Sequence, residues 1–259
     1  MTQPVLAAAA LPEPRRVSVS ALGTALRAGL RDFMTAPLYG LFFSAFYVAG
    51  GLILYLVFAY AGQELWLIPI AVGFPLLAPF AAIGLYEVSR RIEAGEALGW
   101  RQVLGVVFAQ KDRQLPSMAM VILLMFMFWV FVGHTIFALF MGLSAMTNVT
   151  SSLGILFEGN GPVMLAVGTL IGGGFAVVLF SITVVGLPLL LEREVDFISA
   201  MIVSVQAVAL NIVPMALWAG VIACLLVLGM APMFLGLLLV LPVLGHASWH
   251  IYRALTNGG

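Results

Sequence analysis

The three histidines are the residues of this chain with the most versatile chemistry, because imidazole binds metals and transfers protons. His246 and His250 are four residues apart, a spacing that puts both rings on one face of a helix. With a third ligand such as Glu87 the pair could hold a metal ion; alternatively, the two rings anchor a helix end at an interface. His134 is expected too far from them to share a metal. We therefore expect no cofactor, with His246 and His250 as the metal candidates.

The sequence lacks the usual catalytic motifs. It contains no Gly-x-Ser-x-Gly, no His-Glu-x-x-His and no phosphate loop ending in Gly-Lys-Ser or Gly-Lys-Thr. Its single cysteine, Cys224, cannot form a disulfide or a thiolate cluster within one chain. We therefore predict a protein without enzymatic activity.

The most characteristic polar segment runs from Gly84 to Glu96. Glu87 precedes Arg90 and Arg91 by three and four residues, the spacing at which side chains pair on a helix. The segment is either the charged end of a membrane helix or a docking surface for another protein. The predicted interaction surface comprises Glu87, Arg90, Arg91, Glu93, Glu96 and Trp100.

The elements that position these residues follow from composition. Hydrophobic residues make up 63% of the chain and charged residues 8%, whereas about a quarter of a soluble protein is charged. Crossing a bilayer takes roughly 20 apolar residues. Six stretches meet this requirement: 38–60, 66–86, 116–141, 162–189, 213–229 and 232–249. We predict an all-α bundle of six transmembrane helices in one domain, 17–255, with a mobile tail at 1–16 and a short tail at 256–259.

All eleven Lys and Arg residues lie on one side of these stretches. Because Lys and Arg in short loops stay on the cytoplasmic side during insertion, we expect both termini in the cytoplasm and the protein in an inner (cytoplasmic) membrane. None of the six interiors contains Asp, Glu, Lys or Arg. The carboxylate that ion-coupled transporters usually keep is therefore missing.

The chain also shows a threefold repeat. Before each odd-numbered stretch lies an amphipathic segment followed by a proline, Pro37, Pro116 or Pro214. We predict three pseudo-repeats, each an interfacial helix and a transmembrane hairpin. The apolar face of the first interfacial helix, formed by Leu22, Leu26, Leu30 and Phe33, is expected to lie toward lipid or the bundle. Gly168 and Gly172 form a Gly-x-x-x-Gly pattern and are predicted to pack against a neighbouring helix.

The segment 84–96, the six-span layout and the region from Asp112 to Pro116 resemble a family of bacterial integral membrane proteins classed as a domain of unknown function. Some of its members carry a provisional label of cytochrome c oxidase subunit. The resemblance covers about residues 17–255 and brings no catalytic residues with it. A haem-copper catalytic subunit needs more histidine ligands than the three in this chain, so the resemblance implies at most an accessory role beside an oxidase.

Two functions remain open. The first is a non-enzymatic scaffold or accessory subunit of a membrane complex, which predicts a tightly packed bundle. The second is a carrier or channel for a small or apolar solute, in which the proline-bent even-numbered spans surround a path. The expected partners are the lipid bilayer and a membrane protein such as a respiratory complex, or further copies of the chain; nucleic acid is not indicated.

Overall fold

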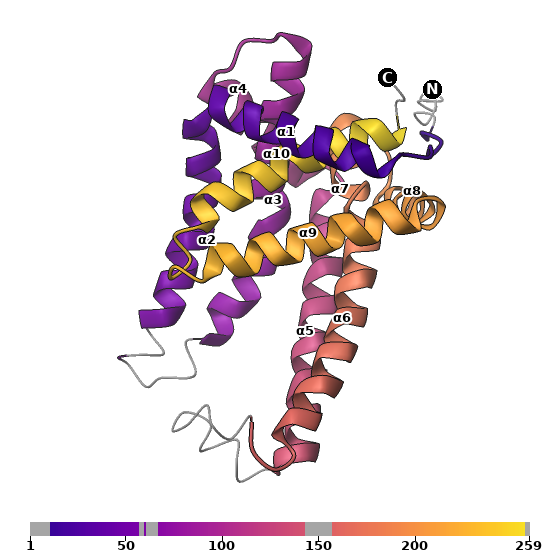
Figure 1. Cartoon of the computed structure of the whole chain (residues 1–259). Coiled ribbons are helices and arrows are strands. Elements are labelled where there is room, and N and C mark those ends of the chain that lie inside the picture. The colour runs from indigo at the N-terminus through magenta and orange to yellow at the C-terminus, as the bar shows by residue number, and fades with distance from the viewer. Residues whose placement is uncertain (1–10, 57–59, 61–66, 143–156, 257–259) are drawn as a thin grey trace, which may run out of the picture. The chain divides into compact units, whose positions relative to one another are not determined.

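The computed structural model describes residues 11–56, 60, 67–142 and 157–256, and the regular elements in these ranges are all helices (Figure 1). The all-α prediction is confirmed. In chain order the helices are α1 (Val19–Thr35), α2 (Pro37–Leu56), α3 (Leu67–Ala94), α4 (Trp100–Ala109), the short 3-10 helix η3 (Gln110–Asp112), α5 (Leu115–Met141), α6 (Gly161–Thr183), α7 (Gly186–Glu192), α8 (Phe197–Leu210), α9 (Ile212–Met230) and α10 (Leu237–Thr256). This order repeats the predicted pattern of a short helix followed by two longer ones.

Within the described residues, three of the predicted spans correspond to helices that are long and apolar enough to cross a membrane. By length and composition, Leu115–Met141, Gly161–Glu192 and Ile212–Met230 can each cross a membrane, in agreement with the spans predicted at 116–141, 162–189 and 213–229. The α1–α2 pair is bent by 100° and adds a fourth if it forms one span. The spans predicted at 38–60 and 66–86 correspond to α2 and α3, with residues 57–59 and 61–66 outside the described part.

Two helices have other bounds than the corresponding predicted membrane spans, and the extension of α3 bears on the polar residues. Helix α3 does not stop at residue 86 but continues to Ala94, because no helix breaker occurs before Gly95, whose φ is +65°. The sixth stretch does not begin at residue 232: residues 231–236 form a turn in which Met233 and Phe234 adopt left-handed conformations, and α10 runs from Leu237 to Thr256.

The chain divides into two compact units, residues 1–120 with 181–259 and residues 121–180. In the first unit, α10 is the central helix. It packs most extensively on α1 and also contacts α2, α3, α7 and α9, and Figure 1 shows it beside α1 and α9. Its second half is fully buried at Trp249, Ile251, Tyr252 and Leu255. The centre of this unit is therefore filled by the side chains of α10.

Helix α1 buries part of its predicted apolar face, Leu22 and Phe33, together with smaller and polar residues. Its buried residues are Leu22, Ala25, Gly29, Asp32 and Phe33, whereas Leu30 is exposed. Gly29 has no side chain and lets the α10 backbone approach, and Asp32 pairs with His250 of α10. Gly29 and Asp32 on the buried face were not part of the prediction, which considered only apolar side chains.

The N-terminal segment is attached to the first unit from Arg15 onward. The Arg15 N–H donates to the carbonyl of Leu255 (2.8 Å), and the Arg15 carbonyl accepts a hydrogen bond from Asn211 Nδ2 (2.8 Å). Residues 1–10 and 257–259, which make up most of the predicted tails, lie outside the described residues. The described ends of the chain therefore meet at one end of this unit.

The second unit contains the paired parts of α5 and α6, which lie side by side in Figure 1. Phe175 of α6 packs against Trp129 of α5 with ring centroids 5.7 Å apart. A Cβ atom at Gly172 would lie 2.8 Å from the Trp129 ring, whereas no described atom lies within 4 Å of a Cβ at Gly168. Close approach of a neighbouring helix therefore occurs at Gly172, and the neighbour is in the same chain.

Candidate functional site

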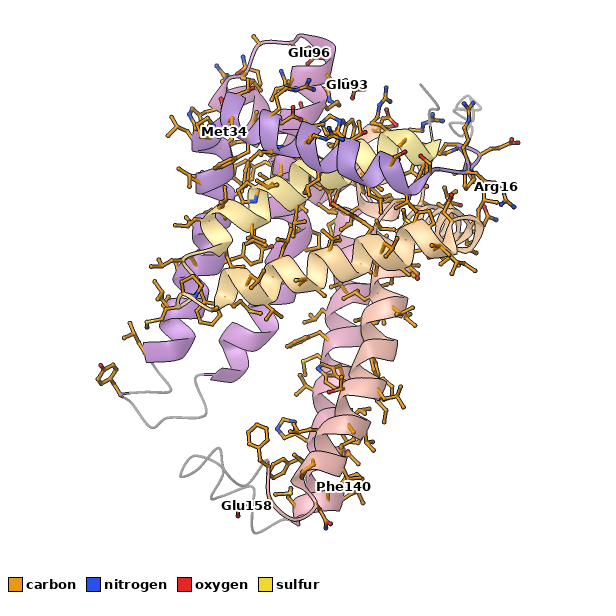
Figure 2. All side chains as sticks on the ribbon, in the orientation of Figure 1. Arg16, Met34, Glu93, Glu96, Phe140 and Glu158 are labelled. Carbon is orange, nitrogen blue, oxygen red and sulfur yellow. The ribbon has the colours of Figure 1, made fainter. Side chains whose placement is uncertain are left out.

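Polar side chains from α1, α3, α7 and α10 gather at one end of the first unit. Figure 2 shows Glu93 and Glu96 there, at the end of α3 and just beyond it. We call this group the polar cap; its members are Asp32, Glu87, Ser89, Arg90, Arg91, Glu93, Glu96, Glu192, His246, Trp249, His250, Tyr252 and Arg253. The extension of α3 to residue 94 positions most of the α3 members on one continuous helix.

Glu87 lies at the centre of the first cluster of the polar cap. Its side chain is 1% exposed and accepts hydrogen bonds from Arg90 Nε (2.7 Å) and Arg91 Nε (2.6 Å). Both arginines also pair with Glu96, at 3.1 and 3.4 Å. The hydrogen bonds to Glu87 raise the pKa of Arg90. The predicted pairing at i+3 and i+4 is present. Both arginines therefore bind carboxylates of their own chain.

A second cluster ties α3 and α7 to α10. Trp249 Nε1 donates to Glu93 Oε2 (3.0 Å), while Arg253 contacts Glu93 (3.1 Å) and Glu192 (2.9 Å). The hydroxyl of Tyr252 also donates to Glu192. Burial and this carboxylate raise the pKa of Tyr252, which keeps its hydroxyl protonated as a donor. Glu93 therefore connects α3 to α10 and is not only a surface charge.

The third cluster is a buried hydrogen-bonded chain between α1, α3 and α10. His250 Nε2 lies 2.7 Å from Asp32 Oδ2, Ser89 Oγ donates to the same oxygen (2.9 Å), and His246 Nδ1 lies 2.8 Å from Ser89 Oγ. Because Ser89 gives its one hydrogen to Asp32, this arrangement requires His246 Nδ1 to be the donor to Ser89. Burial raises the pKa of Asp32, but the hydrogen bonds from His250 and Ser89 outweigh it and lower the pKa. Asp32 is therefore an ionised carboxylate at neutral pH.

The third cluster has the geometry of neither a catalytic triad nor a metal site. Ser89 and His246 are fully buried, and Ser89 donates directly to Asp32. In a hydrolytic triad, the serine donates instead to a histidine that the carboxylate orients. Among the residues that the structure describes, no three His, Cys, Asp or Glu side chains are grouped to hold a metal. His246 and His250 are thus hydrogen-bonded to Ser89 and Asp32, respectively, and these bonds connect α10 to α3 and α1.

A polar recess opens beside these clusters. It has a volume of about 620 Å³. Its lining includes Arg90, Glu93, Ala94, Arg113, Glu192 and Arg253, so it carries both positive and negative side chains. Arg113 also pairs with Glu194, which is 83% exposed (3.0 Å). The recess can therefore receive groups of either charge.

The sequence-derived surface is only partly assembled in this site. Glu87, Arg90, Arg91, Glu93 and Glu96 belong to the polar cap, but Trp100 stacks on Tyr39 of α2 with ring centroids 4.1 Å apart. Sequence reasoning missed Asp32, Ser89, Glu192 and Arg253. Asp32 left one readable signal, because a carboxylate three residues after Gly29 lies on the same helix face as that glycine.

Residues 67–192 match a family model described as "Predicted integral membrane protein (DUF2189)". The match runs from α3 to α7 and covers nearly half of the chain. It confirms the resemblance to an uncharacterised membrane family, and with the apolar helices it makes the chain an integral membrane protein with several membrane-spanning helices. The oxidase label stays a prediction. No curated protein and no solved structure matches this chain.

Proposed function

We propose that this protein is a non-enzymatic scaffold or accessory subunit of a membrane complex, and that the polar recess binds a partner. The observation that carries the proposal is the filled centre of the first unit, where α10 buries Leu244, His246, Ala247, Trp249, Ile251, Tyr252 and Leu255 and is fixed by the second and third clusters of the polar cap. A rigid cap on membrane helices is suited to holding another protein and has no need to alternate between two states.

The same observation weighs against a carrier with bent helices around a path. Pro242, the proline inside α10, is buried, and a Cβ atom at Gly40 of α2 would lie 2.7 Å from it. The bent helix thus packs directly against its neighbour. The buried serine of the Asp32 cluster is equally unsuited to an enzyme, because a nucleophile must reach its substrate.

The chemistry of the recess indicates the kind of partner. In the topology expected from the Lys and Arg distribution, the polar cap faces the cytoplasm. A cytoplasmic loop or tail of a membrane protein that carries both signs of charge would match the mixed lining of Arg90, Glu93, Arg113 and Glu192. We place the partner's contact in this recess, next to the segment that the sequence identified.

The experiment is affinity purification of the full chain from native membranes after mild crosslinking. Replacing Arg90 and Arg91 is a poor test because both hold the buried Glu87. Ala94 lines the recess, is exposed and makes no side-chain hydrogen bond, so Ala94→Trp fills the recess without breaking the clusters. Ala97→Trp is the matched control, since Ala97 is exposed and outside the recess lining.

We expect a membrane protein to be recovered in stoichiometric amount with the unmodified chain and with Ala97→Trp, and to be lost with Ala94→Trp. Equal recovery with both variants would exclude the recess as the contact. Isolation of the chain alone, or only with copies of itself, would overturn the scaffold and favour transport.

A further inference from the structure

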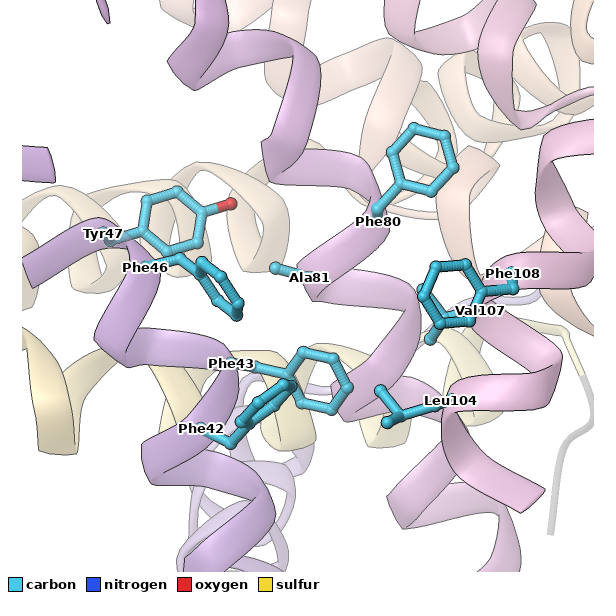
Figure 3. A pocket seen from close by; sticks show the side chains of 9 residues that line it. All are labelled: Phe42, Phe43, Phe46, Tyr47, Phe80, Ala81, Leu104, Val107 and Phe108. Atoms are coloured by element: carbon cyan, nitrogen blue, oxygen red, sulfur yellow. The ribbon is translucent and has the colours of Figure 1, made fainter. Parts of the chain in front are cut away.

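A second, apolar recess lies where α2, α3 and α4 meet. Figure 3 shows Phe42, Phe43 and Phe46 from α2 opposite Leu104, Val107 and Phe108 from α4, with Phe80 and Ala81 of α3 between them. Its volume is about 260 Å³, slightly below the roughly 300 Å³ at which sites for drug-sized ligands begin. We call it the aromatic groove.

The rim of the groove remains open although its lining is hydrophobic. Phe46 and Phe108 are 56% and 68% exposed, while Phe43 and Val107 at its base are buried. Phe46 lies on α2, a predicted membrane helix, and Phe108 on α4, a predicted interfacial helix, so both exposed rings can contact lipid without a hydration penalty. The groove is therefore shaped for an apolar chain that lies against the protein from the lipid side.

One end of the groove lies beside aromatic residues typical of the headgroup region. Phe42, which lines the groove, makes an edge contact with Trp100 (centroids 5.1 Å apart), and Trp100 stacks on Tyr39. Trp and Tyr favour the membrane–water interface because one part of each ring system is apolar and another is polar. This end of the groove is thus the end nearer to the lipid headgroups.

A positive charge stands at the same end. Arg101 follows Trp100 at the start of α4, three and seven residues before Leu104 and Phe108, so the three share one face of the helix. Arg101 is exposed, and in the part of the chain that the structure describes it makes no ion pair. A free guanidinium beside an apolar groove at headgroup level matches an anionic phosphate ester.

We propose that the aromatic groove binds one acyl chain of an anionic phospholipid, with the headgroup phosphate on Arg101. The site is separate from the polar recess, because Glu93, Arg113 and Arg253 line that recess and none of them lines the groove. It does not depend on the scaffold proposal. A second copy of the chain, which could also cover apolar side chains, is an outcome of the test.

The experiment is native mass spectrometry of the full chain purified in mild detergent. The probes are phosphatidylglycerol and phosphatidylcholine with identical acyl chains, so only the headgroup differs. We expect preferential retention of phosphatidylglycerol. Arg101→Gln should lower its retention about fivefold, the factor that corresponds to about 1 kcal/mol of attraction for one arginine near anionic lipid. Arg27→Gln is the charge-matched control, because Arg27 is an exposed arginine on α1, away from the groove.

A groove-filling variant tests the acyl-chain contact separately. Ala81→Leu adds volume inside the groove, and we expect it to lower retention of both lipids, with unchanged helicity by circular dichroism confirming the fold. Equal retention of both lipids by the unmodified chain would overturn the headgroup assignment. A dimer that becomes monomeric in Ala81→Leu would overturn the lipid proposal and give the groove to a second copy.

Discussion

The contact between α1 and α10 depends on the absence of a side chain at Gly29. A Cβ atom there would lie 2.5 Å from the backbone nitrogen of Ala247 and 2.7 Å from the carbonyl oxygen of Val243. These atoms belong to a helix backbone and cannot rotate away as the end of a side chain can. In a Gly29→Ala variant the two helices must therefore separate by roughly 1 Å, a gap that already forfeits much of the van der Waals attraction between them.

The size of the effect follows from one stabilising term and two destabilising terms. Replacing a helical glycine by alanine gains about 0.5–1 kcal/mol of helix propensity, whereas overpacking costs about 1–3 kcal/mol. A separation of roughly 1 Å would also stretch the 2.7 Å contact between Asp32 and His250 beyond hydrogen-bond length, at a cost of about 1.5–3 kcal/mol. We expect Gly29→Ala to lower the free energy of unfolding by about 2–4 kcal/mol.

The control is Gly23→Ala on the same helix. A Cβ atom at Gly23 would have Arg27 Nη2 as its nearest neighbour, at 3.8 Å, so only the propensity gain of about 0.5–1 kcal/mol should remain. The assay is equilibrium unfolding of the purified chain in mixed micelles of a mild and a denaturing detergent. If Gly29→Ala is as stable as Gly23→Ala, the close approach of α1 and α10 described above is wrong.

The remaining predictions concern the polar cap and the second unit. Because the pKa of Asp32 is lowered in the folded state, its contribution to stability is present above about pH 4 and is lost as the pH falls through the folded-state value. Asp32→Asn should lower the free energy of unfolding by about 1.5–3 kcal/mol at neutral pH and flatten this acid dependence, which unfolding measured from pH 3 to pH 7 would reveal. Glu87→Gln should cost about 3 kcal/mol because it leaves two arginines without their buried partner, whereas Glu194→Gln at an exposed pair should change the unfolding free energy by less than about 1 kcal/mol; similar losses would contradict the burial of Glu87. Gly172→Ala should destabilise the pairing of α5 and α6 by about 1 kcal/mol in the same unfolding assay, and a stabilised variant would refute that contact.

The charged segment shows how far local spacing carries the prediction of the site. Glu87, Arg90 and Arg91 pair as the i+3 and i+4 rule predicts, because the partners belong to one helix and its geometry fixes their separation. The same rule said nothing about Glu93, whose partners Trp249 and Arg253 are more than 150 residues away in the chain. The sequence placed Glu93 on an interaction surface and did not predict these contacts, because residues so far apart in the chain have no regular spacing that would indicate that they pair.

Composition and apolar run length determined by themselves that this chain is an all-helical membrane protein, since crossing hydrocarbon requires long apolar helices whose backbone bonds are internal. They also located α5, α6 and α9 within a few residues. Only the tertiary structure decided which face of α1 is buried, because that choice depends on the Gly29 contact and on the pairing of Asp32 with His250 of α10. A carboxylate on an amphipathic helix is expected to face water, because burying it without a partner is costly. Asp32 is buried because it pairs with His250, which is more than 200 residues later in the chain, and no sequence pattern predicts a contact between residues so far apart.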